Sequence, residues 1–101
     1  TTSDEREAQH LARGAVERRL AACAQVGGPV TSVYRWQGAV DTAREWQVVF
    51  KTVRDRYPAL EAYLREAHSY DTPEIIATEI AGGSPEYLAW VAAETRETGD
   101  A

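Results

Sequence analysis

The sequence predicts an α+β domain in which helices cover one face of a β-sheet. Three observations predict it: an amphipathic stripe near the start, two extended runs across a short connection, and two later helices that begin at proline. With 101 residues, 44% of them apolar, the chain has the size of one domain and can bury a core. We expect a single domain over residues 1–101, with a frayed tail at 97–101.

The first element is predicted to be a helix that ends near Leu20. Thr2 and Glu5 have the spacing of a capping box, in which a hydroxyl and a carboxylate satisfy free amide groups. Apolar residues then recur at intervals of three and four, which places one stripe on the core. That stripe consists of Ala8, Leu11, Ala12, Ala15, Val16 and Leu20.

Extended segments are predicted to form a β-hairpin. Residues 21–26 make a short strand that either stops at Gly27-Gly28-Pro29 or continues through it into residues 30–36. Residues 30–36 and 45–53 are rich in β-branched and aromatic side chains, as strands are. The short connection between these two runs predicts that they pair.

Two more helices and one more strand complete the predicted order. Pro58 fits the first position of a helix that runs to about Ala67, and Ser84 with Pro85 begins another. Between these helices, residues 74–80 are predicted to form a strand. A split βαβ plan also requires a strand before the first helix, and we expect that strand to be missing from this chain or its place to be filled by another segment.

The charge distribution excludes several partners. The net charge is −5, and residues 61–101 alone hold nine acidic and two basic side chains. Phosphate backbones and anionic membranes require clustered lysine and arginine, so we expect neither nucleic acid nor a membrane as partner. The sequence shows no apolar run of membrane-spanning length, no signal-peptide pattern and one cysteine, which together predict a cytoplasmic protein.

Five segments of the chain resemble, in order, the CutA divalent-ion tolerance family. They read ERRLAACA at 17–24, TSVYRWQG at 31–38, FKTVRDR at 50–56, HSYDTPEII at 68–76 and GSPEYLAW at 83–90. The resemblance implies a ferredoxin-like subunit with an extended hairpin, a homotrimer shaped like the PII signal proteins, and a role in tolerance of copper and other divalent cations. Some bacterial members have a proposed copper site with an adjacent pair of histidines, and the matching pair here reads Ala67-His68.

The candidate metal ligands are His68, Glu74 and Cys23, with Asp71 nearby in the sequence. Imidazole and thiolate groups suit Cu²⁺ and Zn²⁺, but no CxxC or HxxxH spacing occurs. We therefore expect weak metal binding and no required cofactor. In the alternative interpretation, His68 interacts with a helix dipole and Cys23 is a small buried apolar residue.

No enzyme motif is present, because the chain lacks G-x-S-x-G, GxxxxGK and GxGxxG patterns. We expect a non-enzymatic protein. One alternative is a PII-like sensor that binds a small molecule or anion in an intersubunit cleft lined by Tyr34, Arg35 and Lys51; another is a passive trimeric scaffold. Trp36 and Trp46, on the extended hairpin, are predicted to lie at the trimer interface rather than in an ordinary core.

Overall fold

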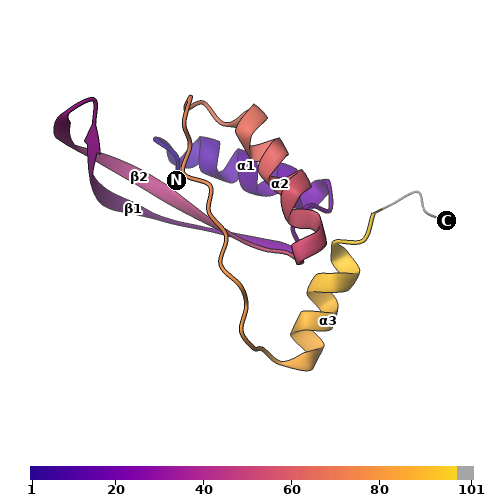
Figure 1. Cartoon of the computed structure of the whole chain (residues 1–101). Coiled ribbons are helices and arrows are strands. Elements are labelled where there is room, and N and C mark those ends of the chain that lie inside the picture. The colour runs from indigo at the N-terminus through magenta and orange to yellow at the C-terminus, as the bar shows by residue number, and fades with distance from the viewer. Residues whose placement is uncertain (98–101) are drawn as a thin grey trace.

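The computed structural model of the chain describes residues 1–97 and consists of three α-helices and one long hairpin, with α1 and α2 beside the base of the hairpin (Figure 1). The element order is α1 (Glu5–Glu17), β1 (Cys23–Trp36), β2 (Ala39–Lys51), a 3₁₀ turn (Arg54–Arg56), α2 (Tyr57–Ala67) and α3 (Pro85–Glu94). The α+β class is therefore confirmed. Within the described residues the sheet has two antiparallel strands, β1 and β2.

The hairpin is one continuous ribbon. Its register runs from Cys23 opposite Lys51 to Trp36 opposite Ala39, with a bulge between Gly27 and Val30. Gln37 and Gly38 both have positive φ, as the tightest hairpin turns require. The predicted hairpin is confirmed, the two predicted strands at 21–26 and 30–36 form one strand, and β2 begins six residues earlier than the predicted run at 45–53.

The start of α1 differs from the prediction. Asp4, not Thr2, caps the helix, because its carboxylate accepts a 2.9 Å hydrogen bond from the amide of Glu7. Thr2 instead pairs with Trp46 of β2 through two backbone hydrogen bonds of 2.8 and 2.9 Å. The predicted capping box is therefore wrong, because Thr2 is held beside the sheet. The helix ends at Glu17, three residues before Leu20.

The later helices begin as expected. Pro58 occupies the first turn of α2, which ends at Ala67. Ser84 caps α3, its hydroxyl accepting a 3.3 Å hydrogen bond from the amide of Tyr87, and Pro85 is the first helical residue. Both predictions are confirmed.

The predicted strand at 74–80 is not formed. These residues have no strand assignment, and most of them are exposed. A strand needs a hydrogen-bonding neighbour, and the nearest free sheet edge is that of β2. A cavity of about 210 Å³, lined by Gln47–Phe50 of β2 and by Glu74–Ile76, separates the two segments. Pattern alone could not reveal this gap.

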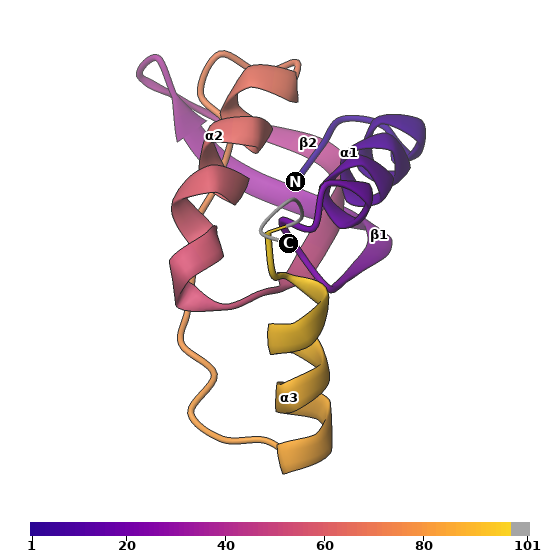
Figure 2. The same ribbon diagram turned by 90° about the vertical axis from the view of Figure 1, so that its right-hand side faces the viewer.

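The core lies where α1 and α2 pack against the base of the hairpin (Figure 2). Its buried members are small or medium-sized: Leu11, Ala15, Leu20, Ala21, Leu60 and Leu64. Gly14 brings α1 close to Tyr63 of α2. Beyond this core the hairpin projects outward, and α3 lies apart from the other helices (Figure 1). The molecule measures 50 × 28 × 22 Å, and its radius of gyration is 14.9 Å, against about 13 Å for a compact domain of this length.

Among residues 1–97, no helix is long and apolar enough to cross a membrane. The predicted frayed tail at 97–101 lies almost wholly outside the described residues. Glu97, the first residue of that tail, forms an ion pair with Arg56, whose guanidinium nitrogen lies 3.0 Å from a carboxylate oxygen of Glu97.

Candidate functional site

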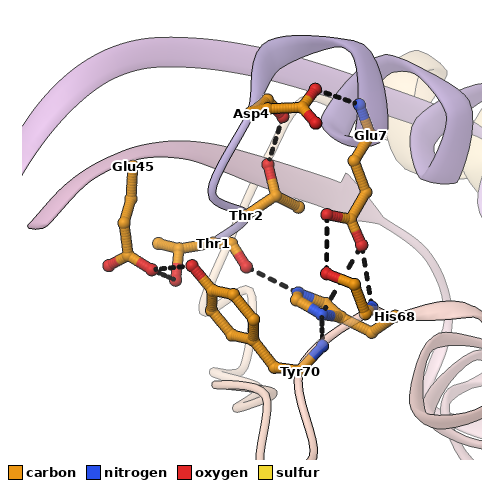
Figure 3. Close-up of polar contacts among 8 residues, drawn as sticks. Thr1, Thr2, Asp4, Glu7, Glu45, His68 and Tyr70 are labelled. Atoms are coloured by element: carbon orange, nitrogen blue, oxygen red, sulfur yellow. Dashed lines mark hydrogen bonds and ion pairs between the residues drawn. The ribbon is translucent and has the colours of Figure 1, made fainter.

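A polar network joins the start of the chain, α1, β2 and the loop after α2 (Figure 3). His68 is the residue that caps the C-terminus of α2, and Ser69 and Tyr70 follow it in this loop. The Glu7 carboxylate accepts hydrogen bonds from the Ser69 amide, at 2.8 Å, and the Ser69 hydroxyl, at 2.9 Å. These contacts fix the loop against α1 and direct Tyr70 toward β2.

Both ring nitrogens of His68 are engaged. Nδ1 accepts a 3.0 Å hydrogen bond from the amide of Tyr70, and Nε2 lies 2.7 Å from the carbonyl oxygen of Thr1. Because a carbonyl oxygen only accepts, Nε2 carries the hydrogen. The side chain is only 4% exposed. A metal ion could bind this imidazole only by displacing one of its two partners.

Glu45 is the buried acid of the network, with 9% of its surface exposed. Its Oε2 accepts hydrogen bonds from the Tyr70 hydroxyl at 2.9 Å and the Thr1 hydroxyl at 3.2 Å. Burial acts to raise the pKa of Glu45, but hydrogen bonds from Ser32, Tyr70 and Thr1 outweigh it and hold the pKa below its usual value. Glu45 is therefore ionised at neutral pH.

Tyr70 is the main hydroxyl partner of Glu45. Burial and the adjacent Glu45 carboxylate raise the pKa of Tyr70 to about 12. Its hydroxyl therefore remains a donor over the whole physiological range. The ring also lies 4.7 Å from that of His68, between centroids.

The Glu45 network forms one wall of a cavity of about 610 Å³. The rest of the cavity is lined by the outer half of β1, including Tyr34 and Trp36, and by the loop at Tyr70–Thr72 with Glu74. This volume is in the range of small-molecule sites, which run from about 300 to 1,000 Å³. The side chains that line it are mainly acidic, aromatic or hydroxyl-bearing.

The predicted metal ligands are only partly brought together. His68 and Glu74 both line the smaller cavity beside β2. Cys23 lies at the base of the hairpin, opposite Lys51, and beside the hydroxyl of Tyr87, whose pKa is raised by burial and by the Cys23 thiol. No three His, Cys, Asp or Glu side chains in the described part of the chain are grouped so as to hold a metal ion.

The predicted cleft residues are also spread along the hairpin. Tyr34 lines the larger cavity, whereas Lys51 is at the opposite end of the hairpin and donates a 2.7 Å hydrogen bond to Gln25. Tyr34 and the ladder partner of Lys51, Cys23, are 11 residues apart on β1, or roughly 35 Å along a strand. Arg35, next to Tyr34 on an alternating strand, points to the other face.

The two tryptophans differ in exposure. Trp36, beside the turn of the hairpin, is 52% exposed. Trp46, nearer the base of the hairpin, is half-buried and lies against Gly28. Trp36 therefore has the larger exposed surface of the two in this chain.

Sequence reasoning missed Glu45, Tyr70 and Ser32 as site residues. One signal was available for Glu45, since an acidic residue inside an extended run of aromatic and β-branched side chains is unusual. The pairing with Tyr70, 25 positions later, carries no local signal.

The fold and the network define a class of small α+β proteins with a projecting hairpin and a polar cluster at the end of the second helix. The family model of the CutA1 divalent ion tolerance protein matches residues 1–94. The chain belongs to this family, as its resemblance predicted. The family description names ion tolerance and no enzymatic reaction.

Individual CutA proteins are similar to this chain over most of its length. The divalent-cation tolerance protein CutA of Thermus thermophilus is 40% identical over 95 residues, which cover 94% of this chain and 92% of that protein. The mouse protein CutA is 38% identical over 91 residues, and the match spans 51% of its length, about half.

Solved structures show the same fold. The Thermus thermophilus protein superposes with a TM-score of 0.92 at 39% identity, covering 94% of this chain and 92% of that one. CutA1 from Oryza sativa gives 0.92 at 35% identity, covering 96% and 89%. A relative from Archaeoglobus fulgidus, with a TM-score of 0.91 at 29% identity over 94% of this chain and 92% of that one, is described as periplasmic.

Proposed function

We propose that the protein is a non-enzymatic, cytoplasmic homotrimer that acts in tolerance of divalent metal ions, copper among them, and binds such ions weakly. Membership in the CutA1 family is the observation that carries this proposal. Neither the metal handled nor the mechanism follows from membership alone. The remaining support comes from the shape of the subunit and from the state of its metal-binding side chains.

The projecting hairpin supports the trimer. Its outer part exposes apolar side chains that the small core cannot cover; Val33 is 67% exposed, Val40 65% and Trp36 52%. By the register, Val33 and Val40 lie on one face of the ribbon and Trp36 on the other, so both faces present exposed apolar side chains to a neighbouring subunit. Edge strands of a two-stranded ribbon also have free backbone groups that a neighbouring sheet can pair with. In the proposed trimer, each hairpin packs against the next subunit.

The state of His68 supports weak metal binding. Its two nitrogens already have partners, and of the other predicted ligands only Glu74 lines the same cavity. A Cu²⁺ or Zn²⁺ ion bound by His68 and Glu74 would have fewer than the four ligands of a closed site. Cys23 lies at the base of the hairpin and does not line this cavity. No metal is required for the subunit to fold in this proposal.

One observation favours the alternative of a small-molecule sensor, namely the cavity of about 610 Å³ beside Glu45. Its acidic lining argues against an anion as the ligand. If the trimer forms, Arg35 and Lys51 of different subunits remain available to an intersubunit cleft.

Native mass spectrometry, with and without Cu²⁺ and with a pool of metabolites, tests the proposal. We expect a trimer in every condition, with substoichiometric and easily removed copper. A monomer at micromolar concentration overturns the trimer. One tightly held metal per subunit overturns weak binding, and a retained metabolite favours the sensor.

A further inference from the structure

The hairpin contains a β-bulge about halfway along its length. At this point β1 has two residues, Gly28 and Pro29, where β2 has one, Trp46. The pairing is regular on both sides of the bulge, from Cys23 to Gly27 and from Val30 to Trp36. A bulge bends the strand that carries the extra residue and increases its local twist. The bulge therefore sets the direction of the outer part of the hairpin, residues 30–45, relative to its base.

Gly28 is the residue that makes the bulge possible. Its φ is +136°, a backbone conformation that residues with a side chain rarely adopt. A Cβ at Gly28 would lie 3.0 Å from the carbonyl oxygen of Glu45 and 3.2 Å from Cα of Trp46. A Cβ at the preceding Gly27, in contrast, would have no other part of the described chain within 4 Å. The close approach of the two strands at the bulge therefore depends on one glycine.

The bulge lies where the anchored base of the hairpin ends. On the other edge of β2, Thr2 pairs with Trp46 through two backbone hydrogen bonds of 2.8 and 2.9 Å. Thr2 is two residues before Asp4, the cap of α1, so this pairing ties β2 to the helices at the position of the bulge. The next residue outward, Glu45, accepts the hydrogen bond from Tyr70. The hairpin is thus held at the bulge, and its outer part projects from there (Figure 1).

The length of the outer hairpin makes its direction important for any contact near the turn. Residues 30–36 extend for roughly 20 Å, at about 3.3 Å per residue. A change of direction of about 20° at the bulge would therefore move Trp36 by roughly 7 Å. Side chains are in contact only when their atoms approach within about 4.5 Å, so a displacement of this size would break a contact made by Trp36.

We propose that the bulge at Gly28 directs the outer hairpin onto the neighbouring copy of this chain, so that assembly depends on the bulge while folding of the subunit does not. This inference rests on the trimer of the proposed function. A second copy fits as the partner because the outer hairpin exposes Val33 on one face and Trp36 on the other, at 67% and 52%. The buried core consists of residues of α1, α2 and the segment between α1 and β1, so its packing does not use the outer hairpin.

Deletion of Pro29 tests the proposal, because it leaves one residue of β1 opposite Trp46 and removes the bulge while the pairing on both sides is kept. Sedimentation of the full chain over a range of concentrations gives the dissociation constant of the trimer. We expect the deletion to raise this constant about tenfold or more, in a variant that circular dichroism shows to be folded. Gly27→Ala is the matched control, because its methyl group meets open space, and its dissociation constant should equal that of the wild type.

Gly28→Ala decides the question if the deletion variant does not fold. Its Cβ must displace the backbone of β2 at Glu45, so we expect it to weaken the trimer as well. A folded deletion variant, or in its place a folded Gly28→Ala variant, that associates as tightly as the wild type overturns this inference alone. If neither variant folds, the bulge is needed for folding itself, which also overturns the inference. A wild type that is monomeric at micromolar concentration overturns the proposed trimer and this inference with it.

Discussion

The Tyr70 hydroxyl donates a 2.9 Å hydrogen bond to Oε2 of Glu45, which joins the loop after α2 to the middle of β2. The Glu45 carboxylate stabilises the protonated Tyr70 hydroxyl, and the Tyr70 hydroxyl stabilises the ionised Glu45 carboxylate. The carboxylate helps to raise the pKa of Tyr70 to about 12, and the hydroxyl helps to lower the pKa of Glu45. The pair therefore stabilises the folded protein only at pH values between the titration of Glu45 and the titration of Tyr70.

The acid side of this range is tested with Glu45→Gln. The pKa of Glu45 is lower in the folded state than its ordinary value of 4.5, so folding favours the ionised form. This contribution is present above pH 4.5 and is lost as the pH falls through the folded-state pKa. We expect wild-type stability to decline there, and the decline to be shallower in Glu45→Gln. Urea unfolding at a series of pH values measures it, and parallel curves for the two proteins would contradict it.

The alkaline side is tested with Tyr70→Phe. The folded-state pKa of about 12 lies above the ordinary value of 10, so folding favours the protonated tyrosine. Its contribution is present below pH 10 and is lost as the pH rises toward 12. Ultraviolet titration of the wild type should show one tyrosine that ionises near pH 12, and that component should be missing from Tyr70→Phe. Tyr34→Phe is the control, because it should retain the late component.

Local patterns predicted the elements whose causes are local. The cap at Ser84 and the start of α2 at Pro58 each depend on a few adjacent residues. Residues 74–80 have a strand-like pattern, but pairing needs a neighbour that no pattern within the segment describes. Thr2 is a good capping residue, yet its backbone pairing with Trp46 takes it out of the cap.

The candidate site was harder to predict for the same reason. The chemistry of His68 makes it a candidate ligand, but its engagement with Thr1 and Tyr70 depends on the tertiary structure. Glu45 gains its importance from burial, which the sequence of β2 does not specify. Side-chain chemistry thus indicates which residues are candidate ligands. Only the packing of distant segments decides which of them still have an atom free to bind a ligand.

Gly14 provides a test of the packing between α1 and α2. A Cβ at this position would overlap the hydroxyl of Tyr63 and crowd its ring. We expect Gly14→Ala to lower the free energy of unfolding by about 1–3 kcal/mol, as overpacking does, despite the better helix propensity of alanine. Urea unfolding at one fixed protein concentration measures the change. Tyr63→Phe in the same background removes the nearest atom and should restore part of the loss; a stabilised Gly14→Ala variant would show that the helices separate freely.

Metal binding is tested with His68→Ala and Cys23→Ser. The wild type should bind Cu²⁺ or Zn²⁺ weakly and without fixed stoichiometry, because His68 must give up a hydrogen bond to act as a ligand. His68→Ala should weaken this binding further, whereas Cys23→Ser should not, since Cys23 lies at the base of the hairpin opposite Lys51. Calorimetry on the three proteins measures it. A tight site that holds one ion per subunit and survives His68→Ala would refute the placement.

Trp36 tests whether the hairpin mediates assembly. In the subunit it is 52% exposed and lies outside the core, so Trp36→Ala should leave the stability of the isolated subunit nearly unchanged. If Trp36 is an interface anchor, its loss should cost about 2 kcal/mol or more of association free energy, as for other aromatic hot spots. Sedimentation over a range of concentrations gives the dissociation constant. Val16→Ala, which trims a side chain 38% exposed on α1 and away from the hairpin tip, is the control and should leave that constant unchanged. An unchanged dissociation constant in Trp36→Ala, with a trimer still present, would place the contact elsewhere on the subunit.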